Sequence, residues 1–177
     1  MKSSWLLAAT FAGVLLCGRA AETGAYEGPR WQFLDAKKAN AAAAEITSAK
    51  YPDSDEATIE KKMVRVYRAD GTGECQDETF VKVLTEKGKR NNRSLSLYYM
   101  LPYSTAEATK IEVIKPGGEA TAVDIAANSK EMIDDSQMGA NIYDPNSKIL
   151  RVNIPNVEIG DVVNANRRHG GVSVGVA

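Results

Sequence analysis

The sequence predicts a mainly β fold, an antiparallel β-sandwich of about seven to nine strands with an N-terminal helix. Short stretches rich in Val, Ile, Leu and Tyr alternate apolar and polar residues, as strands do when one face is buried. Gly, Pro and Asp separate these stretches at intervals of roughly 8–12 residues, which favours a sandwich. One stretch near the N-terminus is instead rich in Ala. With 177 residues, 44% of them hydrophobic, the chain is long enough for a sizeable core.

The first twenty residues are typical of a secretory signal peptide. Lys2 supplies a positive start, residues 5–17 are apolar, and small residues precede a cleavage site near Ala20. The apolar run is shorter than the ~20 residues that cross a membrane as a helix. Leu16 occupies the position where a lipoprotein signal has a small residue, so Cys17 is not expected to carry a lipid. We therefore expect an exported protein, periplasmic or extracellular, with no membrane span.

Residues 21–52 are assigned to a leader and the N-terminal helix. The composition predicts a helix over Pro29–Ala49, because it is rich in strong helix formers and begins with a proline, which suits a first turn. Tyr51-Pro52 would end it. A faint apolar face would consist of Trp31, Leu34, Ala42 and Ile46.

Residues 53–166 hold the predicted sandwich. Its first hairpin turns at Asp70-Gly71, a dipeptide that favours the backbone conformation of tight β-turns. The clearest strand is "SLSLYYML", residues 94–101. Its alternation puts Leu95, Leu97, Tyr99 and Leu101 on one face and Ser94, Ser96 and Tyr98 on the other. A second hairpin turns at Pro116-Gly117, residues 126–147 form a polar excursion, and a further strand covers residues 149–154.

The stretch "RVNIPNVEIGDVVNA", residues 151–165, is interrupted by Pro155 and Gly160. Proline cannot donate to a strand ladder and glycine weakens strand interiors, so one continuous strand is excluded. We expect two strands joined by a shaped turn. Gly160 would allow a backbone conformation that a side chain resists, and Asp161 would accept hydrogen bonds from nearby backbone amides.

Four segments in order resemble the domain of unknown function 3857: "KYPDSDEATI", "RADGTGECQDETFVKVLTEKGKR", "KPGGEATAVD" and "NIYDPNSKILRVNIPNVEIGDVV". The resemblance covers about Lys50 to Asn164. In that family the domain precedes a transglutaminase-like domain in exported bacterial proteins. The resemblance implies a non-catalytic accessory domain that packs on, or positions substrate for, such a domain. The resemblance also implies that the turn at Pro155–Asp161 directs the chain toward that following domain.

Two features depart from the family pattern. No transglutaminase-like domain follows within the 177 residues. Residues 167–177, in "NRRHGGVSVGVA", do not resemble the polar-aromatic strand expected after "GDVVNA". We expect an atypical, truncated tail there.

Residues that could carry chemistry are few. Cys75 is the one cysteine outside the predicted signal peptide and His169 is the one histidine. Cysteine catalysis needs a thiol beside a histidine that a third group holds. Because Cys75 falls in a hairpin and His169 in the atypical tail, we expect a buried structural thiol and a solvated histidine. One cysteine and one histidine cannot build a zinc site without several carboxylates. We expect no catalytic residue, no metal and no cofactor.

The remaining alternative is a stand-alone exported module that binds a cell-surface polymer, either glycan or peptide. Tyr98 and Tyr103 would be stacking residues, while Lys89 and Arg90 belong to a short basic run that could meet an anionic partner. The net charge of −1 and the lack of an extended basic surface pattern speak against nucleic acid. A binding module predicts exposed aromatic residues on one sheet face. An accessory domain predicts an exposed apolar patch near the final strand.

Overall fold

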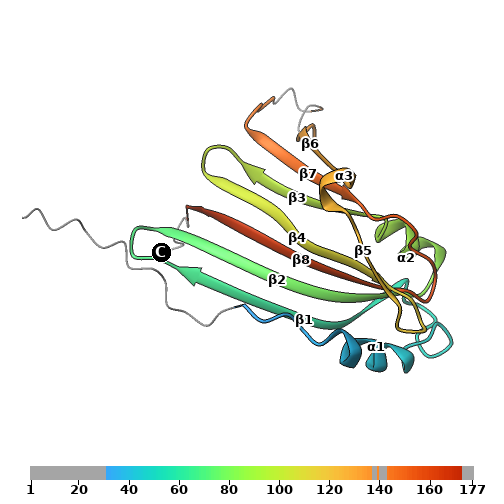
Figure 1. Ribbon diagram of the computed structural model, residues 1–177. Helices are drawn as coiled ribbons and strands as arrows, with labels where there is room; N and C mark the ends of the chain where they lie inside the picture. The colour runs from blue at the N-terminus through green and yellow to red at the C-terminus, as the bar shows by residue number, and fades with distance from the viewer. Residues whose placement is uncertain (1–30, 137–138, 140–142, 173–177) are drawn as a thin grey trace, which may run out of the picture. The chain divides into compact units, whose positions relative to one another are not determined.

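The computed structural model describes residues 31–136, 139 and 143–172 (Figure 1). Their strands form two antiparallel sheets, in the orders β1-β2-β8-β4-β5 and β3-β7-β6. This confirms the predicted mainly β sandwich with an N-terminal helix. The strands are β1 Glu56–Tyr67, β2 Thr72–Val83, β3 Ser94–Met100, β4 Ser104–Ile114, β5 Ala120–Ala122, β6 Ser129–Ile133, β7 Ser147–Asn153 and β8 Val162–Val172. The helices are α1 Ala36–Ala44, α2 Glu86–Asn91 and α3 Ile125–Asn128.

The core between the two sheets is apolar and continuous. Val163 of β8 and Val113 of β4 pack there with Leu97 of β3 and Val152 of β7. We call the side of the five-stranded sheet that carries these residues its inner face. The register of β4 against β8 shifts between Ala108 and Lys110. This extra residue lets the apolar side chains on both sides of the irregularity reach the inner face.

Helix α1 covers the opposite, outer face of the five-stranded sheet. Asp35 caps it by accepting hydrogen bonds from the backbone amides of Lys37 (2.9 Å) and Lys38 (3.3 Å). Ala39 and Ala43 are buried in a second cluster that contains Phe80, Ile114 and Val162. Their spacing of one helical turn puts both methyl groups on the face toward the sheet.

The predicted helix over Pro29–Ala49 was too long. The structure places the helix at Ala36–Ala44 because Asp35 caps one end and the chain turns after Ala44. The predicted apolar face was also wrong in part, since Ala42 is exposed. Composition identified the helix, but the cap and the sheet decide its bounds.

The turn between β7 and β8 has the predicted character. It carries the chain from the three-stranded sheet to the five-stranded sheet. Gly160 has a φ of 94°, a conformation that side chains resist, and Asn156 has a φ of 60°. The buried carboxylate of Asp161 accepts a hydrogen bond from the backbone amide of Glu158 (2.8 Å). The roles predicted for Gly160 and Asp161 are confirmed.

The two predicted hairpin turns are also present. Gly71 has a φ of 80°, and the Asp70 carboxylate accepts from the Thr72 amide (2.9 Å). In the turn that contains Pro116 and Gly117, the positive φ of 87° belongs to Gly118.

Two segments are more regular than predicted. The polar excursion over residues 126–147 contains most of α3 and all of β6, which pairs antiparallel with β7. The expected tail from residue 167 is strand up to Val172, because β8 lies between β2 and β4 and pairs with both. At Gly171 a Cβ would lie 2.7 Å from the Tyr103 carbonyl oxygen, so glycine is required by the close approach of β4. Residues 173–177 lie outside the described residues.

The expected signal peptide, with its cleavage near Ala20, also lies outside the described residues. Within the residues that are described, no helix is long and apolar enough to cross a membrane.

Candidate functional site

A groove of about 510 Å³ lies on the inner face of β1, β2 and β8. We call it the inner-face groove. The β2–β8 register places Cys75, Asp77, Arg167 and His169 on the same face as the core residue Val163, further along the strand. Its charged or reactive lining residues include Lys61, Arg65, Cys75, Asp77, Arg167 and His169.

Cys75 and His169 lie directly opposite each other in the β2–β8 pairing, and Arg65 of β1 faces Cys75 from the other side. Cys75 is half-buried, whereas the sequence predicted a buried thiol. The prediction of a solvated tail histidine was also incorrect, because His169 is a partly buried strand residue. Neither residue carries a local signal for this proximity, which depends on the long-range pairing of β2 with β8.

Asp77 is the buried acid of the groove. Its Oδ2 accepts a hydrogen bond from Arg167 Nη2 (2.5 Å), which also contacts Thr79 Oγ1 (3.2 Å). Buried carboxylates require such a partner, since an unpaired charge would be costly to desolvate. The Asp77 carboxylate therefore forms an ion pair with Arg167.

Burial lowers the pKa of His169 below its ordinary value, and Arg167 lowers it further, although Asp77 opposes the shift. The imidazole is therefore neutral at neutral pH. Among the described residues no hydrogen bond joins it to Cys75 or Asp77. Within that part of the chain, Cys75, His169 and Asp77 are therefore not joined in the hydrogen-bonded set of nucleophile, base and orienting acid that is typical of cysteine catalysis.

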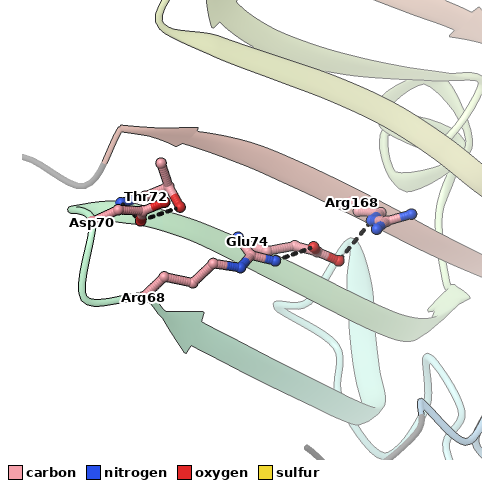
Figure 2. Close-up of polar contacts among 5 residues, drawn as sticks. All are labelled: Arg68, Asp70, Thr72, Glu74 and Arg168. Atoms are coloured by element: carbon pink, nitrogen blue, oxygen red, sulfur yellow. Dashed lines mark hydrogen bonds and ion pairs between the residues drawn. The ribbon is translucent and has the colours of Figure 1, made fainter. Parts of the chain in front are cut away.

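Glu74, also a lining residue, is neutralised by two arginines (Figure 2). Arg168 Nε lies 2.7 Å from one carboxylate oxygen and Arg68 Nη2 lies 3.3 Å from the other. The hydrogen bond from Arg168 is the main cause of the lowered pKa of Glu74. In the same view, Asp70 binds the hydroxyl of Thr72 at 2.7 Å, which orders the end of the β1–β2 hairpin.

The groove retains positive charge after these pairs are formed. Within the described residues, no carboxylate forms a salt bridge with Lys61 or Arg65. The neighbouring Tyr67 hydroxyl, followed by the Cys75 thiol, raises the pKa of Arg65 further above its ordinary value. The groove is thus suited to an anionic ligand.

Exposed apolar residues lie toward the end of the five-stranded sheet at which β1 and β8 finish. Met63 is 43% exposed, Tyr67 67%, Tyr103 63% and Val172 57%. Register pairs Tyr67 with Gly73 of β2, which faces Gly171 of β8. The Val172 amide donates to the Tyr103 carbonyl oxygen (3.0 Å). By strand alternation, Met63 and Tyr67 belong to the inner face of this end of the sheet, and Tyr103 and Val172 to its outer face. We call these four residues the open-end patch.

The contact residues proposed from sequence do not form one site. Lys89 and Arg90 lie in α2, and Lys89 pairs with Glu158 (2.5 Å). Tyr98 is 60% exposed on β3 in the other sheet. Tyr103 lies in the turn between β3 and β4. This turn is at the opposite end of the two strands from α2 (Figure 1). Of the four predicted contact residues, Tyr103 alone belongs to the open-end patch.

Comparisons with solved structures give a likeness above a TM-score of 0.5. It is to a proposed protease of Parabacteroides distasonis, with a TM-score of 0.58 and 13% identity over 66% of this chain. The match covers 23% of that protein, so this chain corresponds to less than a quarter of its length. At this identity the likeness shows the fold alone.

A weaker likeness is to the family 3a carbohydrate-binding module of the cellulosome scaffoldin of Clostridium thermocellum. Its TM-score is 0.33 and its identity 14%, over 63% of this chain and 67% of that one. No inference about this chain rests on a likeness of that size. The chain matches no curated protein.

A family model, by contrast, matches residues 69–171, more than half of the chain. It is the model of a domain of unknown function with a solved structure, DUF3857. The match runs from the Asp70-Gly71 turn to Gly171 near the end of β8, and so includes the first five residues of the segment expected to be an atypical tail. The chain belongs to the family of domain of unknown function 3857.

Proposed function

We propose that this domain is a non-catalytic accessory module, which packs on a transglutaminase-like domain of an exported protein or positions that domain's substrate. The observation that carries the proposal is the open-end patch. Exposed apolar side chains gathered at one place on a domain mark a surface that another molecule covers. The resemblance to this family, whose domain precedes a transglutaminase-like domain, supports that class of neighbour.

The position of the patch supports a neighbour in the same polypeptide. Val172 is both a patch residue and the last residue of β8. Chain that continues beyond β8 therefore leaves the sheet beside the patch. A domain downstream of β8 would therefore begin close to Tyr103, whose carbonyl oxygen accepts from the Val172 amide (3.0 Å).

The non-catalytic part of the proposal rests on the groove. Asp77, the buried acid nearest to Cys75 and His169, is engaged by Arg167. Asp77 Oδ2 binds Arg167 across β2 and β8, and among the described residues no hydrogen bond joins Asp77 to His169. We assign the Arg167–Asp77 pair to the stability of β2 against β8.

Calorimetric titration of this chain with a transglutaminase-like domain tests the proposal. The probe is that domain alone, produced from a family member that carries both parts. We expect association, and the double variant Met63→Ser/Tyr67→Ser should weaken it about tenfold or more, because exposed aromatic anchors dominate such interfaces. Tyr98→Ser is the control, since it removes an equally exposed tyrosine from the other sheet. Equal affinities for all three proteins would contradict the proposal.

The exposure of Tyr98 and Tyr103 favours a second candidate, a stand-alone module that binds a cell-surface glycan or peptide. Co-sedimentation with purified cell-wall sacculi tests it. If Tyr98→Ala and Tyr103→Ala abolish sedimentation while the unfolding temperature stays the same, the binding module replaces the accessory domain as the better reading. Unchanged sedimentation removes the second candidate.

A further inference from the structure

The inner-face side chains of β1 alternate between cation and apolar group. In order they are Lys61, Met63, Arg65 and Tyr67, and all four are exposed. Side chains two apart on a strand point to the same side, so these four form one row along the wall of the inner-face groove. An extended polypeptide has the same two-residue period, and its side chains could match the row one for one.

The charge of this row is not compensated within the described residues. The two acids that line the groove are already paired, Asp77 with Arg167 (2.5 Å) and Glu74 with Arg168 (2.7 Å). Lys61 and Arg65 have no such pair among the described side chains. A segment that carries carboxylates at alternate positions would complement both cations.

β1 is also an edge strand. In the described structure it pairs with β2 alone, at the end of the order β1-β2-β8-β4-β5. An edge of this length presents backbone N–H and C=O groups to which another strand can add. Pairing with a second copy about Met63 would put Lys61 opposite Arg65, and like charges directly opposite each other are destabilising. The edge is thus selective for a segment of opposite charge.

We propose that β1 receives an extended acidic peptide segment of a partner polypeptide, whose carboxylates lie beside Lys61 and Arg65 and whose apolar side chains lie beside Met63 and Tyr67. The backbone of the peptide adds to the edge of the five-stranded sheet. This inference rests on the proposed function, because it names the kind of segment by which the partner docks. A polypeptide is favoured over an anionic sugar since only a polypeptide offers backbone donors and acceptors at strand spacing.

Fluorescence anisotropy with the full chain tests the proposal. The probe is the labelled peptide LSESLSESL, which presents Glu and Leu alternately to one side in either strand direction. Its matched control is LSQSLSQSL, which has the same shape without charge. We expect the acidic peptide to bind about tenfold more tightly than the control, with an affinity that falls as salt is added. Lys61→Glu and Arg65→Glu should each weaken the acidic peptide about tenfold or more.

Lys130→Glu is the matched control variant, because Lys130 is exposed on β6 in the other sheet and the charge change is the same. It should leave binding unchanged. The inference is overturned if the two peptides bind equally, if neither binds, or if Lys130→Glu weakens binding as much as Arg65→Glu. It is also overturned if an oligogalacturonate binds to the groove and the acidic peptide does not. Should Arg65→Glu unfold the protein, Arg65→Gln and the salt dependence of the unmodified chain decide the matter.

The two proposals fail in different ways. If Met63→Ser/Tyr67→Ser weakens association with the transglutaminase-like domain but LSESLSESL does not bind, the accessory function stands and this inference does not. If the acidic peptide binds through Arg65 but the domain does not associate, the groove is a peptide site with another partner.

Discussion

The Lys115 ammonium lies 2.7 Å from the Asp161 carboxylate, and this pair ties the turn after β4 to the turn before β8. Asp161 is 1% exposed. The same oxygen, Oδ2, also accepts from the Glu158 amide (2.8 Å), and Lys115 donates to the Asn156 carbonyl oxygen (2.9 Å). A single carboxylate thus fixes the turn that carries the chain between the sheets.

Asp161→Ala should lower the free energy of unfolding by about 3 kcal/mol, because it leaves the Glu158 amide and a partly buried ammonium without their partner. Urea unfolding followed by circular dichroism measures this. Asp53→Ala is the control, since Asp53 is exposed and should change the free energy by less than about 0.5 kcal/mol. A loss below about 1 kcal/mol for Asp161→Ala would show that the turn is held by its backbone alone.

This turn was predictable from the sequence, because Pro155, Gly160 and Asp161 each carry a local restriction of backbone conformation or hydrogen bonding. The same holds for Asp70-Gly71. The strand over residues 94–100 was predictable too, from its alternation, and so was the sandwich that such strands imply. These signals lie within a few residues of one another.

The inner-face groove was not predictable in this way. Cys75 lies opposite His169, and Asp77 opposite Arg167, only because β2 pairs with β8. The local sequence of neither strand indicates which strand it pairs with. The segment Arg167–Gly171 has no apolar alternation, so it was interpreted as a tail. Pairing with strands on both sides makes it a strand regardless, since its backbone groups find partners from both neighbours. The bounds of α1 depended similarly on a cap and on contacts with the sheet.

Gly88→Ala should destabilise the protein strongly. A Cβ at Gly88 would lie 2.0 Å from the Asp55 carbonyl oxygen, which accepts hydrogen bonds from the Leu84 and Thr85 amides. Either α2 moves or these bonds are lost, so we expect a loss of about 2 kcal/mol or more.

Gly117→Ala is the matched control for Gly88→Ala. No heavy atom among the described residues lies within 4 Å of the Cβ it would add, and the φ of Gly117 is not positive. It should change the free energy by less than about 1 kcal/mol, with stabilisation the favoured sign. Parallel thermal unfolding of the two variants measures the difference, and similar unfolding temperatures would refute the close contact at Gly88.

Glu74 should make the stability sensitive to acid. Its pKa in the folded protein is lowered, chiefly by the hydrogen bond from Arg168. A carboxylate of this kind contributes its stability above its unfolded pKa, about 4.3, and loses it as the pH falls through the lowered value. Because the pair is partly exposed, the contribution is at most about 1 kcal/mol.

The unfolding temperature of Glu74→Gln should therefore fall less between pH 6 and pH 3 than that of the unmodified protein. Glu119→Gln, at an exposed glutamate of the β4–β5 turn, should keep the original pH dependence. If Glu74→Gln and Glu119→Gln reduce the pH dependence of the unfolding temperature equally, the Glu74–Arg168 pair is not its cause.

His169 provides a readout of the groove, because it is the one histidine in the sequence and its imidazole resonances need no assignment. Burial lowers its pKa below the ordinary value of about 6.5. The unfolded state then binds more protons than the folded state once the pH falls below that value, so stability should decline as the pH falls from about 6.5 through the lowered pKa. His169→Gln should abolish this decline while leaving the loss at more acidic pH that Glu74 causes. An NMR titration that gave His169 a pKa at or above 6.5 would contradict burial as the main influence on this imidazole.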